Sequence, residues 1–227
     1  MMANLFEKDA YIKEFETIIK DIDIVNNTIE LENTAFYAKG GGQPGDDGFI
    51  EIDGEKIIVL DTFKKENSKI CHLVENLKNA EKNKTIKGFI NWKKRFKHMK
   101  MHSALHLMCS IIPLGVTGGQ IGYEKSRLDF NDPEKTINKE LKNEKLNKLV
   151  KEDHKISFEL IDTKILEERP EIIRTMSVSP PKINGKIRLV KIGNIDLQPC
   201  GGTHVRSTKE IGEISIGKIE NKGRMNR

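Results

Sequence analysis

The chain has 227 residues, of which 37% are hydrophobic and 32% charged, so its composition indicates a folded protein and excludes a largely disordered one. No run of about 18 apolar residues occurs, and the first ten residues carry charges where a signal peptide needs an apolar stretch, so we expect a cytoplasmic protein without membrane contact. The net charge of +5 is concentrated in basic clusters at 93–100 and 218–227, which favour a nucleic-acid partner, although a solvated lysine-rich surface has the same composition.

The first part of the chain is rich in expected strands. Alternating apolar and polar residues, divided by turn-forming residues, predict short strands near 14–19, 28–36, 48–52, 56–62 and 69–74. Short strands at this spacing predict a small barrel or sandwich. A charged stretch at 79–84 indicates the approach to a second domain, so we expect a first domain over residues 1–88.

The remainder, residues 89–227, is predicted to be a mixed α+β domain. Apolar residues recur at three- and four-residue intervals over 92–112, which indicates a helix that Pro113 and Gly115 end. A second helix is expected over 133–151, with Asp132 as its N-cap and proline in its first turn. Strands are expected near 156–161, 187–192 and 211–219.

Two histidines on the first predicted helix are candidate metal ligands. His102 and His106 are four residues apart, so their rings lie on one helix face and can reach one ion. His98 continues the ladder, but it is about 12 Å of helix away from His106, so these two cannot share an ion. Periodicity alone does not decide which neighbouring pair binds.

The second half of a metal site is the segment from Cys200 to His204. Its two glycines allow a tight turn that brings a thiolate and an imidazole together, and these groups are typical zinc donors. The three cysteines are odd in number and far apart, so we expect free thiols or a metal ligand and no disulfide. A metalloprotease motif needs a glutamate after the first histidine, whereas Ser103 stands there. The chemistry then depends on water activated by the metal or on a base from the substrate.

Three motifs together resemble the AlaX family, the free-standing homologues of the editing domain of alanyl-tRNA synthetase. They are His102-Ser-Ala-Leu-His106, Cys200-Gly-Gly-Thr-His204 and the glycine-rich segment 36–48, which is similar to that of the family's longer members. The resemblance implies a translation-factor-like β-barrel followed by an α+β two-layer editing domain shared with threonyl-tRNA synthetases. It also implies zinc-dependent hydrolysis of Ser-tRNA(Ala), and of Gly-tRNA(Ala) as a further substrate.

The resemblance also implies roles for individual residues. His102, His106 and His204 should bind Zn²⁺, with Cys200 as the fourth ligand or a close neighbour. Thr117 and Gln120 follow the helix expected over 92–112, in the region where the family builds its amino-acid pocket. A Thr117 hydroxyl there could recognise serine and reject alanine, because alanine would leave the hydroxyl unpaired. Gln120 could orient the ester or a water molecule.

Six residues are expected to contact the substrate or tRNA: Gly41, Gly42, Gln43, Lys94, Arg95 and His98. The glycine-rich segment lacks the Lys-Ser/Thr ending of a phosphate-binding loop, so no nucleotide cofactor is expected. The expected partner is mischarged alanine tRNA, and the protein is expected to be a monomer or weak dimer. Two alternatives stay open: a non-catalytic tRNA-binding protein with a structural zinc, and a hydrolase of a free amino-acid derivative.

Overall fold

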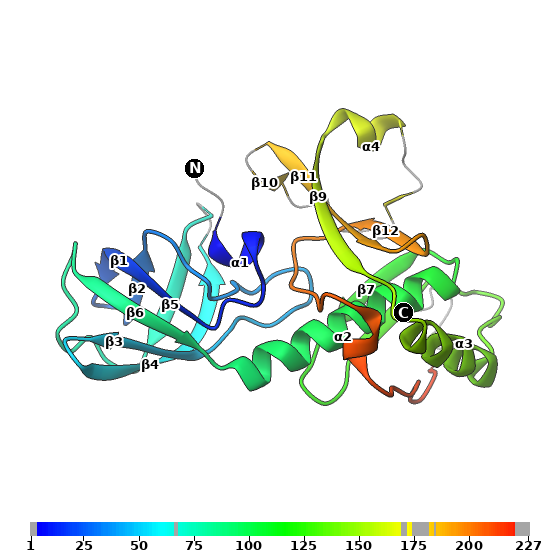
Figure 1. Ribbon diagram of the computed structural model, residues 1–227, viewed down its shortest axis with the longest axis horizontal. Helices are drawn as coiled ribbons and strands as arrows, with labels where there is room; N and C mark the ends of the chain where they lie inside the picture. The colour runs from blue at the N-terminus through cyan, green and yellow to red at the C-terminus, as the bar shows by residue number, and fades with distance from the viewer. Residues whose placement is uncertain (1–3, 66–67, 169–171, 174–181, 184, 221–227) are drawn as a thin grey trace. The chain divides into compact units, whose positions relative to one another are not determined.

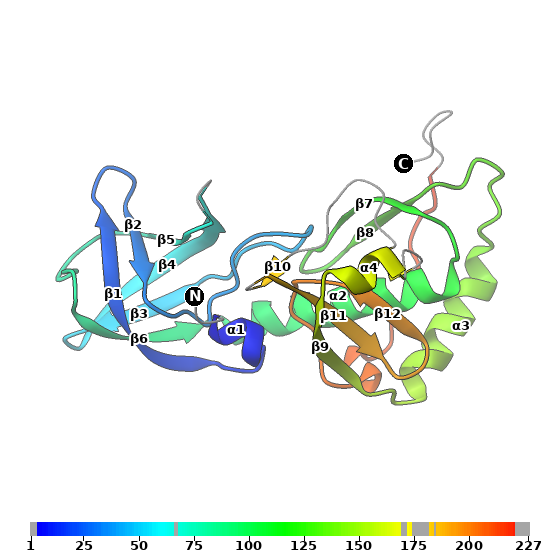
Figure 2. The same ribbon diagram turned by 90° about the horizontal axis from the view of Figure 1, so that it is seen from above.

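The computed structural model describes residues 4–65, 68–168, 172–173, 182–183 and 185–220, and it is an α+β protein (Figures 1 and 2). The chain divides into two compact units, Met1–Lys97 and His98–Arg227, so the division falls inside the long helix α2 (Trp92–Ile111). The boundary expected after residue 88 lies within strand β6. Among the described residues, no helix is long and apolar enough to cross a membrane.

The first unit is built on a closed antiparallel barrel with the strand order β1-β2-β5-β4-β3-β6. A short helix, α1 (Leu5–Lys8), precedes it. The barrel strands are β1 (Glu14–Asp23), β2 (Thr28–Leu31), β3 (Gly48–Ile52), β4 (Glu55–Lys64), β5 (Ile70–Val74) and β6 (Thr85–Ile90). The five expected strands are confirmed, although β2 ends five residues early. Strand β6 was not expected from the sequence; it follows the charged stretch and closes the barrel between β1 and β3.

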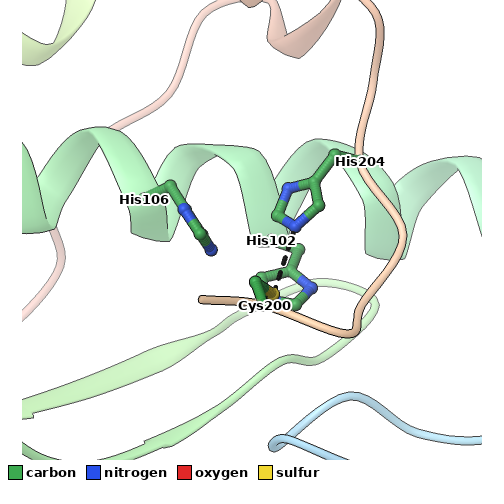
Figure 3. Close-up of side chains that lie close together, drawn as sticks. All are labelled: His102, His106, Cys200 and His204. Atoms are coloured by element: carbon green, nitrogen blue, oxygen red, sulfur yellow. Dashed lines mark hydrogen bonds between the residues drawn. The ribbon is translucent and has the colours of Figure 1, made fainter. Parts of the chain in front are cut away.

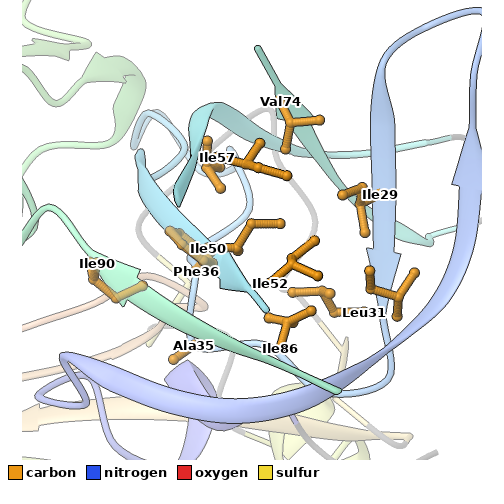
Figure 4. Packing of buried hydrophobic residues seen from close by; sticks show 12 residues of the cluster. Ile29, Leu31, Ala35, Phe36, Ile50, Ile52, Ile57, Val74, Ile86 and Ile90 are labelled. Carbon is orange, nitrogen blue, oxygen red and sulfur yellow. The ribbon is translucent and has the colours of Figure 1, made fainter. Parts of the chain in front are cut away.

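Apolar side chains at alternate strand positions fill the barrel (Figure 4). Ile50 and Ile52 on β3 are two residues apart and almost completely buried, as are Ile57 and Val59 on β4. This spacing follows from the period of two along a strand, which sends successive side chains to opposite faces. The alternation that predicted the strands therefore also identifies the core.

One polar side chain, His72 of β5, lies inside this apolar core. Its Nδ1 lies 2.9 Å from the Ile29 carbonyl oxygen, and its Nε2 lies 2.9 Å from the Thr34 hydroxyl. A neutral ring with its proton on Nδ1 satisfies both contacts, by donating to the carbonyl and accepting from the hydroxyl. Burial lowers the pKa of His72 to about 4.

This buried histidine predicts an acid sensitivity of the barrel. The folded-state pKa lies below the unfolded value of about 6.5, so protons taken up as the pH falls favour the unfolded chain. Between about pH 7.5 and pH 5, His72 should cost about 2 kcal/mol of stability. Urea titrations at both pH values should show a smaller loss for His72→Gln than for the wild type. An equal loss in the two proteins would contradict the prediction.

The second unit combines the rest of α2 with sheets and shorter helices. Strand β11 is the centre of the larger sheet and pairs antiparallel with β9, β10 and β12. A two-stranded sheet is formed by β7 and β8. The elements are β7 (Val116–Gln120), β8 (Arg127–Phe130), α3 (Lys139–Lys151), β9 (Ile156–Asp162), α4 (Lys164–Glu168), β10 (Lys182–Ile183), β11 (Lys186–Ile192), β12 (Asp196–Pro199) and the 3₁₀ helix η2 (Thr208–Ile211).

Two expectations for this unit were wrong. Helix α3 begins at Lys139 rather than at residue 133, and its cap is Asn138, whose side chain accepts from the Leu141 N–H. The Asp132 carboxylate instead accepts from the N–H groups of Thr136 and Ile137, so it stabilises a turn that precedes the helix. Asp132 therefore does act as a capping residue, but it caps this turn and not the helix.

The second error concerns residues 211–219, which form no strand. This segment contains the end of η2 and then a stretch without regular secondary structure, which two asparagine side chains hold against α3. The Asn147 amide donates to the Ile214 carbonyl and accepts from the Ile214 N–H, while Asn143 accepts from the Ile216 N–H. The alternating isoleucines predicted a strand. Their backbone groups instead form hydrogen bonds with asparagine side chains of helix α3.

Candidate metal centre

Helix α2 provides two of the candidate ligands on its buried face. His102 and His106 are each 6% exposed, one helical turn apart, with ring centroids 5.3 Å from each other. Met99, one turn before His102, is also completely buried. Histidines enclosed in this way lose water as a hydrogen-bonding partner, so their ring nitrogens must be satisfied within the site.

The other two candidate ligands come from the glycine-rich turn after β12. Arg188 on β11 holds this turn, because its Nη1 donates to the carbonyls of Cys200 and Gly202 at 2.8 and 3.0 Å. The Cys200 N–H in return donates to the Arg188 carbonyl, and the Gly202 N–H donates to the Cys200 sulfur. The turn is therefore tied to the central strand of the sheet and directs Cys200 and His204 back towards α2.

The four side chains meet at one point, as Figure 3 shows, with their ligand atoms all within 4.8 Å of one another. Cys200 Sγ lies 3.4 Å from Nε2 of His102 and 3.4 Å from Nε2 of His204. Tetrahedral zinc coordination separates a thiolate sulfur from an imidazole nitrogen by about 3.5 Å, given the usual bond lengths. The predicted ligand set thus converges from two segments about 100 residues apart, and the two sulfur–nitrogen distances match those around a tetrahedral zinc ion.

The surroundings favour the metal-binding forms of Cys200 and His204, but not that of His106. Burial alone would raise the pKa of the Cys200 thiol, but its electrostatic interactions with the neighbouring histidines lower that pKa well below its usual value. Burial and the charge of His102 hold the pKa of His204 well below its ordinary range. A thiolate and a neutral imidazole are the forms that bind metal. For His106, burial is outweighed by the hydrogen bond to Asp196, which raises its pKa to about 9.

The two predicted pocket residues lie on β7, close after α2 in the chain. The Thr117 hydroxyl oxygen is buried and has no hydrogen-bond partner within the described part of the chain. A buried hydroxyl without a partner is costly, so this atom is a candidate for binding a substrate group. Gln120, at the end of the strand, is exposed.

The glycine-rich loop adopts the backbone expected of a tight turn. Gly41 and Gly42 have φ values of 55° and 79°, which favour glycine, and Gly40 pairs with Gln43 through two backbone hydrogen bonds. Gly45 is required for another reason, because a Cβ there would lie 2.0 Å from the Thr62 carbonyl oxygen. The Gln43 residue is 1% exposed. Substrate contacts of Gly41, Gly42 and Gln43 stay predictions.

Two of the three residues expected to contact tRNA from the first half of α2 are buried, and their contacts with tRNA stay predictions. Arg95 is completely buried, and its guanidinium forms an ion pair with Asp46 and donates to the carbonyls of Ala10 and Ala35. His98 is 1% exposed and therefore also belongs to the interior. Lys94 is half-buried and forms an ion pair with Asp47 at 2.6 Å, so its role in tRNA binding stays a prediction.

Three residues around the metal centre were missed in the sequence: Ser103, Arg188 and Asp196. Asp196 stands four residues before Cys200, and Arg188 interrupts an apolar strand, which are signals that could have marked them. The sequence marks Ser103 only as the position at which a metalloprotease motif has glutamate. Their functions depend on contacts between segments far apart in the chain, which local patterns do not show.

Two family models match this chain. The model described as "Threonyl and Alanyl tRNA synthetase second additional domain" matches residues 187–227, which include Cys200 and His204. The model described as "tRNA synthetases class II (A)" matches residues 4–94, which form the barrel unit up to the start of α2. Both units of the fold are therefore similar to parts of aminoacyl-tRNA synthetases.

Complete curated proteins are also similar over nearly the whole chain. The alanyl-tRNA editing protein AlaX-M of Saccharolobus solfataricus is 37% identical over 229 residues, which cover 99% of this chain and 95% of the relative. AlaX-M of Methanosarcina acetivorans is 34% identical, covering 100% and 97% of the two chains. AlaX-L of Pyrococcus horikoshii is 33% identical, covering 99% of this chain and 56% of its own.

Proposed function

Because the chain belongs to the AlaX family of alanyl-tRNA editing proteins, we propose that it is a trans-editing hydrolase that removes serine from mischarged alanine tRNA at a zinc centre. Its relatives are named as alanyl-tRNA editing proteins, and the names state neither the amino acid removed nor a metal. The observation that carries the proposal is the convergence of His102, His106, Cys200 and His204 on one point. Glycine is a second amino acid that the same reaction would remove.

A zinc ion held by these four residues would supply Lewis-acid polarisation of the ester carbonyl or of water. The chain itself supplies enclosure and orientation. The buried histidine face of α2 and the turn fixed by Arg188 limit the access of bulk water to the ligands. No carboxylate stands beside the first histidine, so the proton acceptor is proposed to be water or a group of the tRNA terminus.

Thr117 is proposed to select serine over alanine. A serine hydroxyl would pair with the buried Thr117 oxygen, whereas alanine would leave that oxygen without a partner. The resulting discrimination protects correctly charged alanine tRNA from hydrolysis. Gln120 is exposed at the end of β7 and is proposed to orient the ester.

Thr117→Val tests this selection, because valine keeps the shape and removes the hydroxyl. Loss of one hydrogen bond to a substrate hydroxyl should lower kcat/KM for Ser-tRNA(Ala) about 10-fold, equivalent to about 1.4 kcal/mol. Hydrolysis of Ala-tRNA(Ala) should not fall, because valine leaves no unpaired hydroxyl, so the ratio of the rate for Ser-tRNA(Ala) to that for Ala-tRNA(Ala) should decline. Thr136→Val is a control, because its hydroxyl contacts Asp132 in a turn. An unchanged ratio in Thr117→Val would remove this role.

The proposed function is tested with purified protein and Ser-tRNA(Ala). Release of serine should stop when a chelator removes the metal and should return when zinc is restored. Ser-tRNA(Ser) in parallel measures whether the tRNA is recognised, and a small seryl ester measures whether tRNA is needed. Hydrolysis that persists without metal, or no hydrolysis with zinc bound, would reject the proposal.

The ligand set itself favours one competing function, a non-catalytic tRNA-binding protein. Four protein ligands are typical of a structural zinc site, whereas catalytic zinc usually keeps one position for water or substrate. A structural site predicts that removing zinc unfolds the second unit, while a catalytic site predicts lost turnover with the fold retained. Far-UV circular dichroism of the metal-free protein, measured beside the turnover assay, separates the two functions.

A further inference from the structure

In His106 and His204, the ring nitrogen that faces away from the cluster, called the outer nitrogen below, lies close to a side chain outside the ligand set. A histidine that binds metal through one nitrogen depends on the hydrogen bond at the other nitrogen, which decides where the ring proton lies. Nε2 of His204 faces the Cys200 sulfur, so Nδ1 is its outer nitrogen. In His106, Nδ1 faces Asp196, which leaves Nε2 directed towards the cluster (Figure 3).

Asp196 determines the state of His106. Its carboxylate is 2% exposed and lies 3.1 Å from His106 Nδ1. An ionised carboxylate only accepts hydrogen bonds, so the Nδ1 nitrogen carries a proton, and the neutral ring that binds a metal then has its lone pair on Nε2. The Gln198 amide donates to both Asp196 oxygens, at 2.8 and 2.9 Å, and thereby fixes the carboxylate. All three side chains are buried, which makes these bonds hard for water to replace.

Ser103 stands in the same relation to His204. Its hydroxyl oxygen is completely buried, lies 3.2 Å from His204 Nδ1 and accepts from the Val205 N–H at 3.2 Å. A hydroxyl has two lone pairs, so this oxygen can accept from the Nδ1–H as well as from the backbone. The serine next to His102 therefore ties two consecutive residues of the distant turn to α2.

We propose that Asp196, supported by Gln198, and Ser103 are positioning residues of the metal centre. They hold the proton of His106 and of His204 on Nδ1 and present both Nε2 atoms to the same ion. Ser103 thus occupies the motif position of a metalloprotease base but acts on a ligand rather than on substrate. The inference rests on the proposed zinc centre and adds the residues that organise it.

Zinc affinity measures this role without any use of tRNA. Competition with a chromophoric chelator should show about 10- to 100-fold weaker binding for Asp196→Asn and for Ser103→Ala. Ser103→Thr keeps the hydroxyl and should recover most of the affinity. Two matched controls should bind zinc like the wild type: Asp132→Asn, a buried aspartate that caps a turn, and Ser110→Ala, whose hydroxyl bonds to Leu107 on the same helix.

Cobalt(II) spectra of the same variants report the coordination geometry, which a general loss of stability would not alter. We expect Asp196→Asn and Ser103→Ala to change the spectrum and the controls to keep it. If Asp196→Asn fails to fold, Gln198→Met leaves the carboxylate in place and should still weaken zinc binding several-fold.

The outcomes separate the two proposals. Wild-type zinc binding with unchanged affinity in Asp196→Asn and Ser103→Ala overturns the positioning role and leaves the proposed hydrolase intact. Loss of affinity in Ser103→Ala that Ser103→Thr does not restore also overturns the role of the hydroxyl. A wild-type protein that binds no zinc rejects the zinc centre itself, and the positioning role with it.

Discussion

Replacing His204 by alanine is expected to remove zinc from the protein and to slow deacylation of Ser-tRNA(Ala) about a thousand-fold. His204 Nε2 lies 3.4 Å from the Cys200 sulfur, and its ring centroid lies 4.3 Å from that of His102. His204 is therefore one of the four groups that could hold the ion. Lewis-acid stabilisation by a metal is worth several kcal/mol, and about 4 kcal/mol corresponds to this factor. Zinc content by elemental analysis and single-turnover release of serine are the two measurements.

His154→Ala is the matched control for this variant. His154 belongs to the same unit but pairs with Glu152, outside the cluster, so its loss should change neither zinc content nor rate. His98→Ala adds a second comparison, because His98 is buried on the same helix without belonging to the ligand group. Full zinc content and normal deacylation in His204→Ala would refute the assigned metal centre.

The second large effect is expected from Arg95, which is bound to Asp46, Ala10 and Ala35 within the first unit. Removing one partner of a buried ion pair leaves an uncompensated charge, at a cost of about 3–5 kcal/mol. Arg95→Ala should therefore strongly destabilise the first unit. Of the hydrogen bonds that the structure shows at the Asp46 carboxylate, only the one from the Tyr37 N–H would remain. Trp92, the single tryptophan, stands three residues away and packs on Tyr11 and Phe96, so its fluorescence reports the unfolding of this unit.

Lys94→Ala is the control for Arg95→Ala. Its ion pair with Asp47 has comparable chemistry but is partly exposed, and such pairs contribute at most about 1 kcal/mol. Arg95→Lys should be intermediate, because lysine keeps the charge but loses the planar group that reaches several acceptors. Equal urea midpoints for Arg95→Ala and Lys94→Ala would show that the buried pair adds no more stability than the surface pair.

Local periodicity predicted much of the fold because it follows from chain geometry. The strands of the barrel alternate with period two, and α2 repeats at three and four residues, so both were recognisable without a tertiary structure. Where local signals competed, the prediction failed. Asp132 caps a turn rather than α3. The backbone of Ile214 and Ile216 forms hydrogen bonds with asparagine side chains of α3, where a strand would pair with a neighbouring strand.

The direction in which α2 faces was the least predictable feature. Its apolar residues indicated a helix, but the structure buries Arg95, His98, His102, Ser103 and His106 as well. A polar side chain is buried only where a partner is available, and the partners lie far along the chain. For His106 the partner is Asp196, 90 residues away, and for Ser103 it is His204, 101 residues away.

The sequence by itself determined the ligand types, their order and the helical and turn segments that contain them, because these depend on residue identity and spacing. Only the tertiary structure decided that the two segments meet, and that Arg95 and His98 face inwards. It also decided that Ser103 and Asp196 contact the outer nitrogens of the ligands. Such contacts arise from packing between distant segments, and packing depends on the whole fold rather than on any local pattern.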